Sequence, residues 1–166
     1  MTSIENPLAS QVPLIARMQS QVQTWEAAAD GRALFLGCYQ LMTRNMFAAL
    51  AAHEFSDRIW VDRLLHRFAD YYFDALTIYE RDPAAAPAVW RMAHDAARRR
   101  ETAVLRKVLL GVNAHINYDL VLTVAELLQP EWPDLGPAQR AARQADHEQV
   151  NNVIGRTVDA VQDQIL

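Results

Sequence analysis

Apolar residues recur at helical spacing along almost the whole chain, and this periodicity restricts the fold more than any other feature of the sequence. The alternation of apolar and polar residues that would indicate strands is absent. The 166 residues include only five glycines and seven prolines. Alanine, leucine, arginine, glutamate and glutamine, which favour helices, are abundant. The sequence therefore predicts an all-α protein, a compact bundle of about six helices.

Length, charge and cysteine content restrict the class of protein. A chain of 166 residues is long enough for one domain with a sizeable core, so we expect a single helical domain over residues 1–166. The formal net charge of -4 argues against a general nucleic-acid binder, which is usually basic. The single cysteine, Cys38, lies in an apolar run, where we expect it in the core and in a reducing cytoplasm. Because there is no signal-peptide pattern and no apolar run near bilayer length, we expect no membrane partner.

Start and stop signals place the individual helices. Ser56 is the predicted N-cap of the third helix, and an interruption of the last helix is predicted near Asp146. Gly111 lies inside the fifth helix and predicts the close approach of a neighbouring element. The predicted ranges are Pro13 to Asp30, Ala33 to His53, Asp57 to Arg81, Pro87 to the arginines 98–100, Thr102 to Leu128, and Ala138 to Gln164.

The segment 109–122, LLGVNAHINYDLVL, is the most informative for function because it carries polar side chains inside an apolar helix. At helical spacing, His115 and Asp119 lie one turn apart on one face, and Asn113 and Asn117 share a second, roughly opposite face. A buried polar group without a partner costs roughly 1–3 kcal/mol. The segment is therefore either a polar core network or a functional site.

The His115 and Asp119 pair has two interpretations. A carboxylate one turn after a histidine can accept the Nδ1 proton, orient the ring and raise its basicity, as in a general-base pair or in the support of a metal ligand. The alternative is a local hydrogen bond within a satisfied core, since structural networks perturb titrating groups as well.

The third helix adds carboxylates that could complete such a site. Apolar residues surround Asp74, which predicts that Asp74 is the most buried of the ridge and Asp62 the most exposed. If the third and fifth helices pack together, Asp74 meets His115 or Asp119, and the group would suit a first-row divalent metal ion. The ridge has spacing four and consists of Asp62, His66, Asp70 and Asp74.

Other chemistries have little support in the sequence. Lys107 is the only lysine, and we expect it on an exposed turn. No serine-hydrolase elbow, Walker loop or dinucleotide motif is present, so no nucleotide cofactor is predicted. Tyr72 and Trp90 are candidates to line a pocket. Asn151 lies one turn after His147, on a face that we expect to be solvated.

The chain resembles an uncharacterised, mostly bacterial family of small helical proteins with a segment of the form LLGxNAHINxDL, here Leu109 to Leu120. The similarity extends upstream through Tyr72 to Leu76 and the Trp90 helix, and downstream to Val150-Asn151. That family has no assigned reaction, so the resemblance implies a site without implying a function. The residues it singles out are His115, Asn117 and Asp119, together with Asp74, Tyr72 and Asn151, whereas Asp70, His66 and His147 depart from the family pattern and are not expected as ligands.

The sequence therefore predicts a small-molecule-binding enzyme with its pocket between the third and fifth helices. In this prediction His115 is a general acid/base or metal ligand, Asp119 orients it and Asp74 is the second carboxylate, for hydrolysis, proton transfer or cyclisation. The predicted substrate contacts are Asn113, Asn117, Tyr72, Trp90 and Asn151. The alternative is a non-catalytic interaction module in which the same residues form a structural polar core. The sequence leaves the oligomeric state open.

Overall fold

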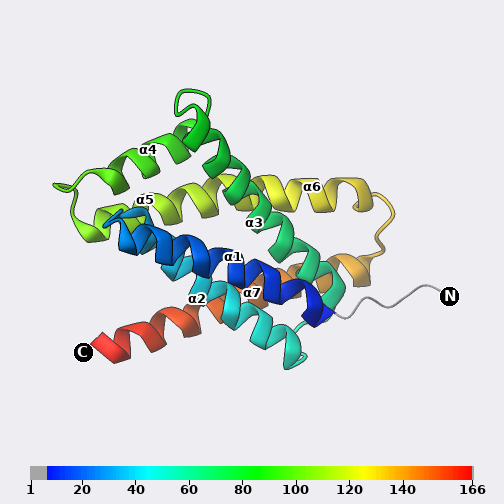
Figure 1. Cartoon of the computed structure of the whole chain (residues 1–166). Coiled ribbons are helices and arrows are strands. Elements are labelled where there is room, and N and C mark those ends of the chain that lie inside the picture. Colours follow the sequence, from blue (N-terminus) through cyan, green and yellow to red (C-terminus); the bar gives the residue numbers. More distant parts are fainter. Residues whose placement is uncertain (1–6, 166) are drawn as a thin grey trace.

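A computed structural model describes the backbone of residues 7–165 and the side chains of residues 11–158. These residues form helices joined by short loops, without a strand (Figure 1). Because α5, η1 and α6 form one continuous rod behind α3, the bundle has the six helical rods that the periodicity predicts. The elements are α1 (Pro7–Ala27), α2 (Arg32–Ala51), α3 (Arg58–Arg81), α4 (Ala88–Arg98), α5 (Val104–Ala114), the π-helical turn η1 (His115–Leu120), α6 (Val121–Glu131) and α7 (Pro137–Ile165).

Beyond shifts of one to three residues at other helix ends, the helices differ from the predicted ones in three features. α1 begins at Pro7, ahead of the predicted start, and contains Pro13. The N-cap of α3 is Asp57, whose side chain accepts a hydrogen bond from the Trp60 backbone N–H at 3.0 Å, and not Ser56. The fifth predicted helix contains a π-helical turn that its sequence pattern does not reveal.

The predicted interruption near Asp146 is wrong, since α7 is continuous from Pro137 to Ile165. The Asp146 carboxylate is buried and accepts hydrogen bonds from the backbone N–H groups of Ser56 at 2.6 Å and Asp57 at 2.8 Å. These donors lie at the start of α3, where a helix leaves N–H groups without partners. Asp146 therefore joins α7 to α3 and does not end its own helix.

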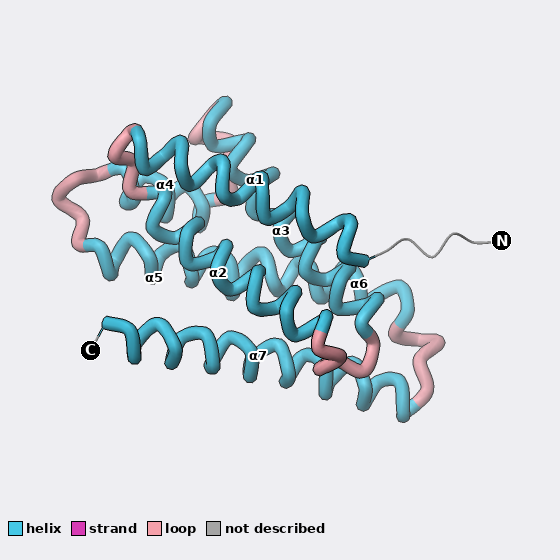
Figure 2. Tube along the Cα trace, turned by 60° about the horizontal axis from the view of Figure 1, so that its bottom comes forward, coloured by secondary structure: helices cyan, strands magenta, loops and turns pink. Residues whose placement is uncertain are grey.

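The core that positions the predicted site lies between α2, α3, α4 and the α5–η1 segment. Its aromatic side chains include Phe35, Tyr39, Phe68, Tyr72 and Trp90, all buried. A second apolar cluster is built around α2, α3 and α7, which runs along one side of α2 (Figure 2). The two clusters fix the helices on both sides of the bundle.

At Gly111, α5 and α2 approach each other closely. A Cβ atom on Gly111 would lie 2.5 Å from Cγ of Phe35, closer than real side-chain contacts allow. The close approach predicted for this glycine is confirmed. Cys38, by contrast, is exposed on α2 and is not the core residue that its apolar surroundings in the sequence predicted. The apolar neighbours of Cys38 belong to the buried face of α2, and Cys38 lies outside that face.

The helix Val104–Glu131 is apolar and largely exposed. By length and composition alone it could cross a membrane, with a mean hydropathy of 1.3 over its most apolar window. Its apolar residues do not form an uninterrupted run, because polar residues such as Asn113 and Asp119 lie among them. Core helices of globular folds meet the same criteria. In this bundle the helix packs against α2, α3 and α4, yet only 28% of that window is buried.

Candidate functional site

The π-helical turn η1 brings His115 and Asp119 to the inner side of the bundle. Nδ1 of His115 lies 2.9 Å from Oδ2 of Asp119, and both side chains are buried. Such wide turns within α-helices occur often at functional sites. The sequence prediction that these two residues share one face and form a pair is therefore realised in the structure.

Trp90 from α4 completes a three-residue network. Its Nε1–H donates to both oxygens of Asp119, at 2.9 Å and 3.1 Å. One turn later on the rod, the Thr123 hydroxyl donates to the backbone carbonyl of Asp119 at 2.7 Å. Asp119 is fully buried, and its two oxygens accept from Trp90 and His115. This network ties α4 to the α5–η1–α6 rod through charge-assisted hydrogen bonds.

Aromatic rings enclose the His115 imidazole. The ring stacks on Phe68 with centroids 3.6 Å apart and meets Tyr39 edge-on at 4.1 Å. Burial lowers the pKa of His115, against the opposing effect of the hydrogen bond and charge of Asp119. The imidazole is therefore neutral at neutral pH, and Nδ1 is the donor to the Asp119 carboxylate.

Nε2 of His115 has no hydrogen-bond partner although it is buried. A neutral imidazole with a free lone pair, oriented by a carboxylate, has the electronic properties of a general base or a metal ligand. Such chemistry also requires a reacting group within hydrogen-bond reach. With 4% of its surface exposed, His115 offers no approach to a substrate in this conformation.

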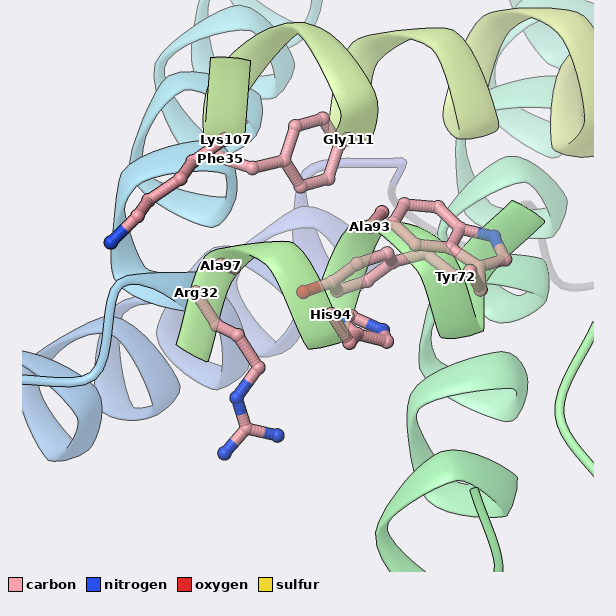
Figure 3. Close-up of a pocket in the computed structure, with 9 residues that line it drawn as sticks. Arg32, Phe35, Tyr72, Ala93, His94, Ala97, Lys107 and Gly111 are labelled. Carbon is pink, nitrogen blue, oxygen red and sulfur yellow. The ribbon is translucent and has the colours of Figure 1, made fainter. Parts of the chain in front are cut away.

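A cavity of about 10 Å³ lies beside this network, between α2, α3, α4 and α5 (Figure 3). It is large enough for about one water molecule. Tyr72 and Trp90 line it, together with His94, but His115 does not. Figure 3 shows the Arg32 and Lys107 side chains extending in different directions from the group of lining residues. Arg32 is paired with Asp30 and Glu80, at 2.7 Å and 3.1 Å.

Residues 12–166 match DUF5995, which is described as a family of unknown function. The chain belongs to this family. The match confirms the predicted resemblance to a family without an assigned function, and it covers nearly the whole chain. No curated protein and no solved structure gives a significant match to it.

Asp74 lies apart from the His115 network. It is exposed on α3, whereas Asp62 at the start of the ridge is half-buried, so the predicted order of burial is wrong. The buried stripe of α3 contains Tyr72 and Phe73, and Asp74 follows them on the outward face. In the DUF5995 chain Asp74 and His115 therefore do not form the two-sided site that the sequence predicted.

The predicted substrate contacts divide into two groups. Tyr72 and Trp90 are core residues beside the cavity. Asn113 and Asn117 are exposed, and the Asn117 amide donates to the Asn113 carbonyl oxygen at 2.8 Å. Asn151 is exposed on α7, as its solvated face predicted. The structure thus brings the two asparagines together on the surface and separates them from His115.

No group of three histidine, cysteine or acidic side chains that could hold a metal ion occurs among the residues described for the DUF5995 chain. His115 and Asp119 could supply two metal ligands, but both Asp119 oxygens already accept hydrogen bonds. An open hollow of about 300 Å³ between α2 and α7 contains none of the predicted site residues.

His94 is a further buried residue of this region that was not predicted from the sequence. It stacks on Trp90 with centroids 5.2 Å apart, and its Nε2 is buried without a hydrogen-bond partner. Burial lowers the pKa of His94 to about 4, and the charge of Arg32 acts in the same direction. His94 lies one turn after Trp90, on the same buried stripe of α4, so helical periodicity from Trp90 could have predicted that His94 is buried.

Proposed function

We propose that this chain is a helical interaction protein that binds another protein chain through the exposed face of the α5–η1–α6 rod. The His115–Asp119–Trp90 network then serves as a polar core that fixes how α4 packs on the rod. This assignment favours the second of the two functions that the sequence left open.

The exposure of the outer ridge of the rod is the observation that carries the proposal. We define the outer ridge as the six exposed residues at spacing four along the rod. Its apolar members include Leu105, Leu109 and Val121, with 68%, 55% and 60% of their surface exposed. Exposed apolar surface of this kind, here with two asparagines at its centre, is typical of interaction sites. The outer ridge consists of Leu105, Leu109, Asn113, Asn117, Val121 and Ala125.

The rod also lacks exposed charge along most of its length. Between Val108 and Ala125 the only charged residue is Asp119, which is buried. Depletion of charge at the centre of a surface patch distinguishes protein interfaces from ordinary surface. The outer ridge spans about 30 Å at 1.5 Å per residue, a length suited to packing against another helix.

The two asparagines favour a protein partner over a lipid surface. Their mutual hydrogen bond uses one amide N–H of Asn117 and the carbonyl oxygen of Asn113. Each asparagine therefore keeps donor and acceptor capacity for a partner. Lipid hydrocarbon provides no hydrogen-bond partner for these amide groups, whereas polar side chains of another helix can bind them.

Photo-crosslinking inside cells tests this proposal. A benzophenone amino acid replaces Leu109 or Val121 on the outer ridge, and Val12 on α1 is the matched control because it is 70% exposed. We expect a discrete protein adduct from positions 109 and 121 and none from position 12. Adducts that form equally from all three positions, or only with lipid, would overturn the proposal.

The unpartnered Nε2 of His115 favours a second candidate, a small-molecule or metal-assisted enzyme site that opens between Phe68 and Tyr39. Each unsatisfied buried group calls for an explanation, and a bound ion or ligand is one of them. Elemental analysis of protein purified without a metal-affinity tag is the first test. A stoichiometric metal that is lost in His115→Ala would support this candidate, and a metal-free protein would remove its metal-assisted form.

A further inference from the structure

We propose that the partner of the outer ridge is a second copy of this chain, bound antiparallel across a two-fold axis that passes close to His115. This inference rests on the proposed interaction function and specifies its partner. In such an assembly the same surface serves both copies, so a residue i that contacts j of the partner is matched by j contacting i.

The outer ridge is symmetric about its own centre. Two apolar residues, two asparagines and two apolar residues follow one another from Leu105 to Ala125. In an antiparallel pair centred on position 115, Leu109 lies opposite Val121 of the other copy and Asn113 lies opposite Asn117. The apolar positions meet apolar positions, and amides meet amides. A surface that is complementary to itself in this way needs no other partner to satisfy it.

The charges beyond the two ends of the outer ridge are also complementary. Exposed Arg99, Arg100 and Arg106 outnumber the exposed Glu101 near its N-terminal end. Near its C-terminal end lie the exposed Asp134 and Glu126, of which Glu126 also pairs with Arg67 of the same chain at 2.9 Å. Antiparallel association places the cationic end of one copy beside the acidic end of the other. Parallel association would place like charges together, which disfavours it.

The central asparagines fix the register of this pair. A shift by one helical turn would place Asn113 or Asn117 against leucine or valine, leaving amide groups without partners. A buried asparagine pair selects register in helical assemblies by this penalty, at some cost in affinity. We therefore expect one register and a reversible dimer, since a single helix pair is at the lower end of interface size.

A second row of residues beside the outer ridge, half-buried except for Val112, which is 39% exposed, enlarges the apolar contact. They also lie at spacing four and carry no charge. Ile116 and Leu120 pack partly against the aromatic core, so they connect the proposed interface to the interior of the bundle. This second row consists of Val108, Val112, Ile116, Leu120, Val124 and Leu128.

Disulfide trapping between single-cysteine variants tests the inference. Both variants, Leu109→Cys and Val121→Cys, are made in the Cys38→Ala background because Cys38 is exposed. The two positions are about 18 Å apart along one helix, far beyond the Cα separation of about 7 Å that a disulfide spans. A bond between them therefore forms only between copies.

We expect a mixture of the two purified variants to give a disulfide-linked dimer under mild oxidation, while each variant alone and Val12→Cys remain monomeric on non-reducing gels. Self-linking of each variant alone would contradict the antiparallel arrangement. Monomeric wild-type chain in light scattering at several hundred micromolar, with no linked dimer, would overturn the second copy as partner. Photo-adducts from positions 109 and 121 to a different protein would still support the proposed function in that case. Binding to anionic phospholipid vesicles, without dimers, would overturn both.

Discussion

Replacing His115 by alanine is expected to destabilise the fold strongly. The change removes a ring that stacks on Phe68 at 3.6 Å and a hydrogen bond to Asp119 at 2.9 Å. A hydrogen bond to a charged group contributes about 1.5–3 kcal/mol. Truncation of a large buried side chain to alanine costs about 2–5 kcal/mol. Because neighbouring effects do not add fully, we expect a total loss of about 3–5 kcal/mol in the free energy of unfolding.

Two further variants separate the contributions. His115→Phe keeps the ring and removes the unpartnered Nε2, so only the hydrogen bond to Asp119 is lost and we expect a smaller cost of about 1–3 kcal/mol. Asn117→Ala lies on the same rod but is exposed, and we expect a change within about 0.5 kcal/mol. Urea unfolding followed by tryptophan fluorescence, at one low protein concentration, measures all three. A loss below about 1 kcal/mol for His115→Ala would refute the interpretation of this network as a structural core.

Three further predictions concern pH, packing and the exposed carboxylate. The pKa of His94 is lowered to about 4 and that of His115 is also lowered, both by burial. Below about pH 6.5 the unfolded chain therefore binds more protons than the folded chain. The stability that these two histidines contribute is complete above about pH 6.5 and falls as the pH drops towards 4. The lowered pKa of His94 corresponds to a loss of about 3 kcal/mol in the free energy of unfolding at acid pH. A urea midpoint that does not change between pH 7 and 4 would contradict this prediction. Gly111→Ala forces Phe35 to move and should lower the free energy of unfolding by about 1–3 kcal/mol, despite the better helix propensity of alanine. A raised melting temperature would contradict this prediction. Asp74→Asn should leave both stability and association unchanged within error, because Asp74 is exposed away from the network; a large loss of either would return Asp74 to the site.

The sequence predicted well where the helices lie and that the 109–122 segment has two opposite polar faces, because both features depend on helical periodicity. His115 and Asp119 face inward together, as spacing of four residues requires. The opposite face, with Asn113 and Asn117, is exposed to solvent. The prediction that these amides contact substrate depended on burial, which periodicity alone does not specify.

Predictions that needed tertiary packing were less accurate. Asp74 has apolar neighbours in the sequence, but they belong to the inner face of α3 and leave Asp74 outside. Cys38 is exposed on α2 for the same reason. The π-helical turn at His115 and the Trp90 hydrogen bonds to Asp119 depend on how α4 packs against the rod. No local pattern contains that information.

The yield of the photo-adduct from position 109 tests the central claim most directly, when it is compared in three backgrounds. The backgrounds are the otherwise unchanged chain, the Val121→Glu variant on the outer ridge and the Val12→Glu variant on α1. Val121 is 60% exposed and Val12 is 70% exposed. Because both valines are exposed, neither change should alter the fold by more than about 0.5 kcal/mol. We predict that the adduct disappears with Val121→Glu and persists with Val12→Glu. An adduct that survives Val121→Glu unchanged would contradict the assignment of the outer ridge as the interaction surface.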